Sequence, residues 1–208
     1  MPGSRVPWGT VSRERVIQVA TKRVRAGRYE ELTIRGLASE LGVSPMSLYR
    51  HVRSKDDLID EVVDRLLARC WRPRTVSDDW LAWVAEAADR LRRFLVSQPA
   101  ALHVYLRHPV VSPAAIARMD AIMEVLRRAL PDEDSARRAY GAIHSYTVGC
   151  GVLEASRAGW APPETDPDGL AQQLAAYTTP RQFGEGLRYL LDGLCAQALF
   201  KAAEARVP

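Results

Sequence analysis

The segment from Thr33 to Lys55, TIRGLASELGVSPMSLYRHVRSK, predicts two short helices joined by a tight turn. Thr33 is a residue type that caps helix N-termini, and the apolar residues after it recur at intervals of three and four, as on one face of a helix. Gly42 stands where the first helix should end, because glycine adopts a left-handed backbone conformation without a clash at Cβ. Ser44 and Pro45 then suit the cap and the first turn of a second helix.

Ala38, Gly42 and Leu48 have the spacing of a helix-turn-helix. A small residue lets the helices cross, glycine makes the turn, and an aliphatic residue fixes the second helix on the first. An ordinary pair of packed helices uses the same common residues, so the spacing alone does not separate the two explanations. Polar, aromatic and cationic side chains around the second helix favour DNA binding, because such groups contact phosphates and base edges. The exposed positions of the second helix are predicted to hold Met46, Ser47, Tyr49, Arg50 and His51, and Arg35, Arg53 and Lys55 flank this helix.

Charge is distributed unevenly along the 208 residues. Residues 1–55 contain eleven Lys or Arg and four Asp or Glu, which gives a net charge of +7. Residues 56–208 contain 18 cationic and 21 anionic side chains, which gives −3. The cationic surface therefore lies on the helix-turn-helix portion, where neutralisation of DNA phosphates would supply affinity.

With a predicted helix on each side, the segment resembles the DNA-binding domain of TetR-family transcriptional repressors. The pattern LTIRGLASELGVSPMSLYRHVRSKDDLID, Leu32 to Asp60, carries the resemblance. The resemblance implies an all-α fold, with an N-terminal three-helix helix-turn-helix DNA-binding domain followed by a C-terminal helical ligand-binding and dimerisation domain. It also implies a bacterial, cytoplasmic protein that binds double-stranded operator DNA.

The resemblance implies roles for single side chains around the second helix. Family members commonly contact phosphates or bases at the positions of Thr33, Ser47, Tyr49, His51 and Lys55, and some reach a base edge from the position of Arg35. Arg50 occupies an often variable position, and we expect it to read bases. A small or polar residue is frequent at the position of Met46, so this side chain either contacts a thymine methyl group or only packs. The predicted DNA-binding set is Thr33, Arg35, Ser44, Met46, Ser47, Tyr49, Arg50, His51 and Lys55.

We expect three parts along the chain: a flexible arm over 1–11, the DNA-binding domain over 12–56, and the ligand-binding and dimerisation domain over 57–208. A helix over about 55–70 has an apolar face wide enough to bridge the two domains. Boundary residues and helical spacing predict the other helices, and no segment alternates like a strand. These helices lie at about 12–26, 78–97, 99–108, 112–130, 133–158 and 181–205, with a Pro- and Asp-rich loop over 159–168.

The sequence lacks the motifs that characterise several other classes of protein. No nucleophile elbow, glycine-rich phosphate loop or paired-carboxylate motif occurs, so we do not expect an enzyme. The three cysteines are far apart and the four histidines lack an i, i+4 partner, so we expect no metal and no cofactor. No run of about eighteen apolar residues and no signal pattern occurs, so we expect no membrane association.

Aromatic and methionine residues with few polar neighbours recur along the C-terminal helices. Such side chains line ligand cavities, but at helical spacing they more often form ordinary core. The family resemblance favours a cavity that binds a small, largely apolar effector. The predicted ligand-binding set is Trp80, Trp83, Phe94, Tyr105, Met119, Met123, His144, Tyr146 and Trp160.

The last two long helices carry more apolar surface than one neighbour can cover, and glycines in the first of them permit close approach of another helix. They either fill a monomer core or form a homodimer. The resemblance favours a homodimer through a four-helix bundle, which matches a two-fold operator. The predicted interface set is Gly149, Gly151, Leu187, Leu190, Leu191 and Leu194.

The resulting hypothesis is a ligand-responsive repressor that binds a pseudo-palindromic operator as a homodimer. An effector that favours one tilt of the bridging helix would change the separation of the two recognition helices and release the DNA. The alternative is a DNA-binding regulator whose C-terminal helical domain responds to a protein partner rather than to a small molecule.

Overall fold

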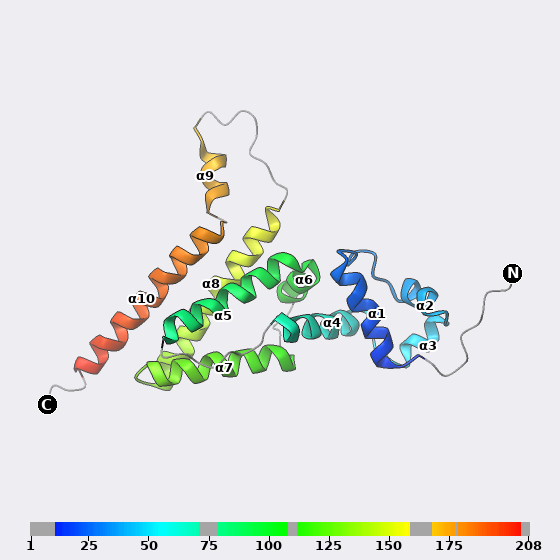
Figure 1. Ribbon diagram of the computed structural model, residues 1–208, viewed down its shortest axis with the longest axis horizontal. Coiled ribbons are helices and arrows are strands. Elements are labelled where there is room, and N and C mark those ends of the chain that lie inside the picture. Colours follow the sequence, from blue (N-terminus) through cyan, green and yellow to red (C-terminus); the bar gives the residue numbers. More distant parts are fainter. Residues whose placement is uncertain (1–10, 71–78, 108–111, 159–167, 178, 205–208) are drawn as a thin grey trace. The chain divides into compact units, whose positions relative to one another are not determined.

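The computed structural model describes residues 11–70, 79–107, 112–158, 168–177 and 179–204 (Figure 1). All helices and strands assigned within these ranges are α-helices, which confirms the predicted all-α class. The predicted flexible arm falls almost entirely outside the described residues. The helices are α1 (Arg13–Arg25), α2 (Ile34–Leu41), α3 (Pro45–Tyr49), α4 (Lys55–Cys70), α5 (Trp80–Ser97), α6 (Pro99–Arg107), α7 (Pro113–Ala129), α8 (Glu133–Ser156), α9 (Leu170–Ala176) and α10 (Pro180–Glu204).

Polar caps fix the starts of the first helices where the sequence predicts them. Ser12 Oγ accepts a hydrogen bond of 3.2 Å from Arg15 N at the start of α1, and Thr33 Oγ1 accepts one of 3.0 Å from Gly36 N at the start of α2. Each bond satisfies a backbone N–H that has no partner within its helix. α2 ends at Gly42, whose φ of 68° lies in the left-handed region, so the predicted turn is confirmed.

Helix α9 has no counterpart among the helices predicted from the sequence. This helix has seven residues, LAQQLAA, and follows Gly169, whose φ is +64°. Two turns of helix are too short for a 3.6-residue period to stand out from chance, because periodicity is judged over windows of about 11 to 18 residues.

The chain forms two packing units, which do not follow the expected boundary at residue 56. The first contains α1 to α3, α4 up to Arg69, α6, and α7 up to Ala115; the second contains α5, the rest of α7, and α8 to α10. Within the first unit, Asp64 Oδ1 accepts a hydrogen bond of 2.8 Å from Ala114 N, and the rings of Tyr29 and His103 lie 5.4 Å apart. These contacts join residues far apart in sequence, so no local pattern could predict them.

Aliphatic side chains from four helices and one connecting segment form the core of the first unit. They have less than 2% of their surface exposed, so each contributes about 1.5–3 kcal/mol through burial. This core holds the helix-turn-helix as one body. The side chains are Ile17, Leu32, Leu37, Leu48, Leu58 and Ile59.

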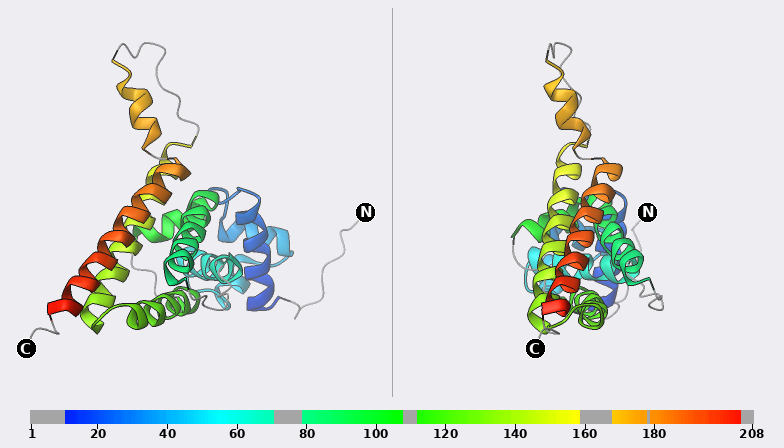
Figure 2. Two further views of the ribbon diagram at one scale, coloured as in Figure 1. Left: turned by 60° about the vertical axis from the view of Figure 1, so that its left-hand side comes forward. Right: turned by 90° about the vertical axis from the view of Figure 1, so that its left-hand side faces the viewer.

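In the second unit, α8 packs on α5, and α10 contacts both helices. The two views of Figure 2 show α8 and α10 running side by side. Gly151 allows the close approach of α8 to α5, because a Cβ at this position would lie 3.1 Å from Leu95 Cδ1. The buried core includes Trp83, Val84, Ile122, Met123, Leu126, Ile143, Phe183, Leu187 and Leu191.

Candidate nucleic-acid interface

The second helix of the helix-turn-helix, α3, has one buried side chain, Leu48, which is 0% exposed. The rest of α3 faces outward: Met46 is 75% exposed and Tyr49 is 52% exposed. The buried leucine anchors one side of this helix, and the exposed methionine and tyrosine lie on the other. The outer face of the helix is therefore free to contact a partner.

Ser44, Ser47 and Arg50 form a connected polar row on the outer side of α3. Ser44 Oγ accepts a hydrogen bond of 3.3 Å from Ser47 N and lies 3.1 Å from Ser47 Oγ. Arg50 Nη2 donates to Ser47 Oγ at 3.3 Å. The row starts the helix and orients an exposed guanidinium, which still has donors available for the acceptors of a guanine edge.

The N-terminal end of α2 adds a second cation to the same unit. Arg35 is exposed and forms no hydrogen bond or ion pair with the residues that the structure describes. The guanidinium of Arg23 already has partners within the protein: its Nε donates to Glu40 Oε2 at 2.7 Å and its Nη2 donates to Gly36 O at 3.3 Å. Of these two arginines, Arg35 is the one available to DNA.

Contacts among α1, α3 and α4 fix the end of α3. The Arg13 guanidinium donates to the backbone carbonyl of His51 and to the carboxylate of Glu61. Lys55 Nζ lies 5.9 Å from the centre of the Tyr29 ring, which is within the range of a cation–π contact. Both His51 and Lys55 therefore belong to the packed end of the motif, while their side chains remain partly or fully exposed.

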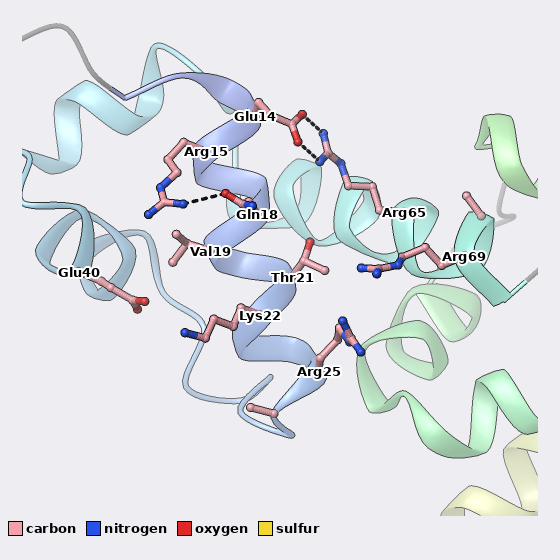
Figure 3. A pocket seen from close by; sticks show the side chains of 12 residues that line it. Glu14, Arg15, Gln18, Val19, Thr21, Lys22, Arg25, Glu40, Arg65 and Arg69 are labelled. Carbon is pink, nitrogen blue, oxygen red and sulfur yellow. Dashed lines mark hydrogen bonds and ion pairs between the residues drawn. The ribbon is translucent and has the colours of Figure 1, made fainter.

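A pocket of about 890 Å³ with several charged side chains lies in the first unit, where residues of α1, α4 and Glu40 of α2 line it (Figure 3). Glu14 Oε1 and Oε2 accept hydrogen bonds of 2.7 and 2.6 Å from Arg65, and this contact lowers the pKa of Glu14. Other cations of the lining form no ion pair with a described residue: Lys22, Arg25 and Arg69. Sequence reasoning missed the pocket, although the exposed residues of α1 recur at helical spacing. Its charged lining does not suit a largely apolar ligand.

The structure gathers part of the predicted ligand-binding set in the second unit. Trp83 and Met123 are buried in the core, with Trp80 and Tyr146 packed against it. Phe94 is buried on α5, His144 is partly buried on α8, and Met119 is 37% exposed. Tyr105 belongs to the first unit, and Trp160 lies outside the described residues.

Tyr146 holds α10 against α8. Its hydroxyl donates to Phe183 O at 3.2 Å, and its ring stacks on the Phe183 ring at 5.5 Å. A Cβ at Gly186 would lie 2.1 Å from the same hydroxyl oxygen, so only glycine permits this approach. Burial raises the pKa of Tyr146 to about 12, which keeps the hydroxyl protonated as a donor. These contacts assign Tyr146 a packing role.

The predicted interface set divides into buried and exposed residues. Leu187 and Leu191 are 2% and 4% exposed within the single chain, and Gly151 packs against α5. These three residues pack within the single chain, so their apolar character does not require a partner chain. Gly149 is exposed with no atom within 4 Å of a built Cβ, and two further members, Leu190 and Leu194, are only partly buried.

Two family descriptions match this chain. The description "Bacterial regulatory proteins, tetR family" matches residues 19–62, which include α2, α3 and the start of α4. The description "Tetracyclin repressor-like, C-terminal domain" matches residues 72–198, more than half of the 208 residues. The chain belongs to the TetR family. The resemblance of Leu32 to Asp60 is thereby confirmed.

Relatives of this TetR-family chain include repressors. It is 30% identical over 147 residues to the HTH-type transcriptional repressor DrrR1 of Streptomyces coeruleorubidus, a match that covers 70% of this chain and 54% of the relative. It is 29% identical over 187 residues to the tetracycline repressor protein class C of Escherichia coli, with 88% and 83% covered. The chain thus spans about half the length of DrrR1.

Solved structures share the fold of this TetR-family chain. A possible TetR family transcriptional regulator from Streptomyces coelicolor A3(2) has a TM-score of 0.74 at 28% identity, covering 89% of this chain and 99% of the other. BioQ with its double-stranded DNA operator has a TM-score of 0.68 at 26% identity, covering 90% and 99%. ActR from Streptomyces coelicolor in complex with actinorhodin has a TM-score of 0.72 at 23% identity, covering 91% and 98%.

The two relatives are named as repressors, and the first of these solved structures is named as a possible TetR family transcriptional regulator. The TetR-family chain is accordingly a DNA-binding transcriptional regulator and not an enzyme, as its sequence predicts. Within the described ranges, no three His, Cys, Asp or Glu side chains are grouped to hold a metal ion. No helix in the described part of the chain has both the length and the apolar character needed to cross a membrane.

Proposed function

We propose that this regulator is a bacterial cytoplasmic repressor, which binds a pseudo-palindromic operator as a homodimer and is released by a small organic effector. The observation that carries the proposal is the outward face of α3, where Ser47 and Arg50 form one polar row on a helix anchored by the buried Leu48. A short helix presented in this way fits the major groove and reads base edges there.

We assign each residue of the predicted DNA-binding set either to the bases or to the phosphates of the operator. Arg50 and Ser47 read bases, Arg35 reads a further base edge, and Met46, 75% exposed, is positioned to contact a thymine methyl group. The phosphate contacts come from Thr33, Ser44, Tyr49, His51 and Lys55. BioQ, which shares the fold at 26% identity, was solved with its double-stranded DNA operator and so supports operator binding by this fold.

A homodimer requires apolar surface that the single chain leaves uncovered. Leu153 on α8 is 49% exposed and Tyr189 on α10 is 65% exposed. Gly149 on α8 and Gly193 on α10 have open space beyond a built Cβ, so another helix could approach closely at both. We propose that these faces, together with Leu190 and Leu194, meet their two-fold copies in a four-helix bundle, while Gly151, Leu187 and Leu191 support them from within.

Effector binding is proposed for the second unit, in the region of Trp80, Trp83 and Met123. The support is the aromatic and methionine content of this unit and the ActR complex, in which the same fold holds actinorhodin. The effector can release DNA only through a difference in its affinity for the DNA-bound and the free conformations.

Selection of bound duplexes from a random DNA pool tests the proposed function. We expect enrichment of a two-fold symmetric sequence with half-sites about 10 base pairs apart, or a multiple of that spacing. A pool that shows no enriched sequence, or an enriched half-site without symmetry, would refute operator recognition by a homodimer.

A further inference from the structure

Arg118 on α7 is a buried cation in the second unit, with only 4% of its surface exposed. Its one hydrogen-bond contact with the described residues joins Nη2 to His144 Nδ1 at 3.4 Å. Its Nε is buried without a hydrogen-bond partner. A guanidinium stays protonated in proteins, so Arg118 places a full positive charge with unused donors inside the fold.

Arg92 on α5 is a second buried arginine of the same unit, and carboxylates balance its charge. It is also 4% exposed, but it donates to Asp89 Oδ1 at 2.7 Å and to Glu154 Oε2 at 2.6 Å. Its guanidinium carbon also lies 5.2 Å from the centre of the Phe183 ring. Two carboxylates thus balance one buried arginine, whereas none forms an ion pair with Arg118 among the described residues.

The group that does face Arg118 cannot balance its charge. Burial, reinforced by Arg118, lowers the pKa of His144 to about 4, so the imidazole is neutral at pH 7. The Tyr140 ring stacks on His144 at 5.5 Å, and burial raises the pKa of this phenol, so Tyr140 is also neutral. Asp120, two residues along α7, is exposed and forms no ion pair with Arg118.

We infer that Arg118 binds the carboxylate of an organic acid. The effector of this regulator would then be a molecule with one carboxylate and an otherwise apolar body. The inference rests on the proposed effector response and names the chemistry of its ligand. Nε and an adjacent Nη of a guanidinium match the two oxygens of a carboxylate, and such a pair forms strong, charge-assisted hydrogen bonds. A bound acid would supply a negative charge beside Arg118, with which no carboxylate of the described residues forms an ion pair.

Neutral rings and aliphatic side chains on α7 and α8 are the proposed contacts for the body of the acid. His144 and Tyr140 offer neutral, stacked rings, and both lie on α8 close to the buried Ile143. On α7, Ile122 is buried one turn beyond Arg118. One cation beside neutral rings and aliphatic side chains is the arrangement that suits a ligand with one acidic end and an apolar remainder.

Titration with matched acids and amides tests the inference without DNA. The probes are naphthalene-2-carboxylate and decanoate, each compared with its primary amide, which has nearly the same shape and no charge. With the full-length wild-type protein, we expect at least one acid to bind tenfold or more tightly than its amide. In Arg118→Met this preference should disappear.

Arg69→Met is the matched control for general attraction of anions, because Arg69 is an exposed cation of the pocket in the first unit. This variant should keep the wild-type preference for the acid. Equal binding of acid and amide, binding of neither, or an acid preference that survives Arg118→Met would each overturn the inference.

The melting temperature of the ligand-free protein gives a second test that does not depend on the choice of acid. Arg92→Met removes the hydrogen bonds that the guanidinium donates to Asp89 and Glu154 and leaves Asp89 with Arg93 alone, so it should lower the melting temperature by several degrees. Arg118→Met removes a buried charge that no carboxylate in the described part of the chain balances by an ion pair, so it should leave the melting temperature unchanged or raise it. A loss as large as that of Arg92→Met would show that Arg118 has a structural partner and would refute its role as an anchor.

The outcome for DNA separates this inference from the proposed function. If the protein enriches a symmetric operator that neutral compounds release and acids do not, the repressor function stands and the assignment of Arg118 fails. If acids bind through Arg118 but no operator is enriched, the binding site stands and the proposed function fails.

Discussion

Replacing Leu48 by alanine should separate the recognition helix from the core and abolish DNA binding. Leu48 is the buried residue of α3, is 0% exposed, and its carbonyl accepts hydrogen bonds from His51 N and Val52 N at 2.8 and 3.0 Å. Truncation of a fully buried leucine costs about 2.7–5 kcal/mol, because apolar contacts are lost and a cavity remains. Since Leu48 is the one buried side chain that α3 (Pro45–Tyr49) contributes to the described core, most of this loss falls on the position of the recognition helix.

Met46→Ala is the matched control on the same helix, because Met46 is 75% exposed. Exposed substitutions of this kind change stability by no more than about 0.5 kcal/mol. Urea denaturation measures the stability of each variant, and fluorescence anisotropy with the selected duplex measures its DNA affinity. If Leu48→Ala is no less stable than Met46→Ala, or binds the duplex as tightly as the wild-type protein, then Leu48 does not hold α3 in place.

Three further predictions concern single side chains. Arg50→Ala should relax base preference at one position of the half-site by about 1–3 kcal/mol, measured by repeating the selection; an unchanged preference would remove Arg50 from base readout. Lys55→Gln should weaken binding to all sequences alike and reduce the slope of log affinity against log salt by about 0.9 per chain, whereas an unchanged slope would rule out a phosphate contact. The pKa of His144 is lowered to about 4, below its ordinary value, so the unfolded chain binds more protons and the stability that neutral His144 contributes is lost as the pH falls from about 6.5 to about 4. In His144→Gln, urea denaturation should show a flatter dependence on pH over that range, and an equally steep one would assign the dependence to other groups.

Local chemistry explains why the helix-turn-helix was predictable. Ser12, Thr33 and Ser44 each cap a helix within three residues of their own position, and Gly42 adopts the left-handed conformation that a turn requires. These features depend on neighbours in the sequence, so they can be read from it directly. The same holds for the exposure of Met46 and Arg50, which follows from helical spacing around Leu48.

Features that depend on long-range packing were not predictable. Membership of α6 in the first unit rests on contacts such as Tyr29 with His103, which no local pattern encodes. Leu187 and Leu190 have the same residue type, yet one is buried in the chain's own core and the other lies at its edge. In the sequence, Arg118 resembles any other arginine of an amphipathic helix, and only the fold shows that it is buried and forms no ion pair with a carboxylate of the described residues.

Operator affinity measured with and without a bound effector shows whether this regulator responds to a ligand. We predict that an effector acid found in the titrations lowers operator affinity at least tenfold, which corresponds to about 1.4 kcal/mol of coupling. By linkage, saturating operator DNA must weaken binding of the same acid by the same factor. Equal affinity of the acid for the free and the operator-bound protein would contradict the account of a ligand-responsive regulator.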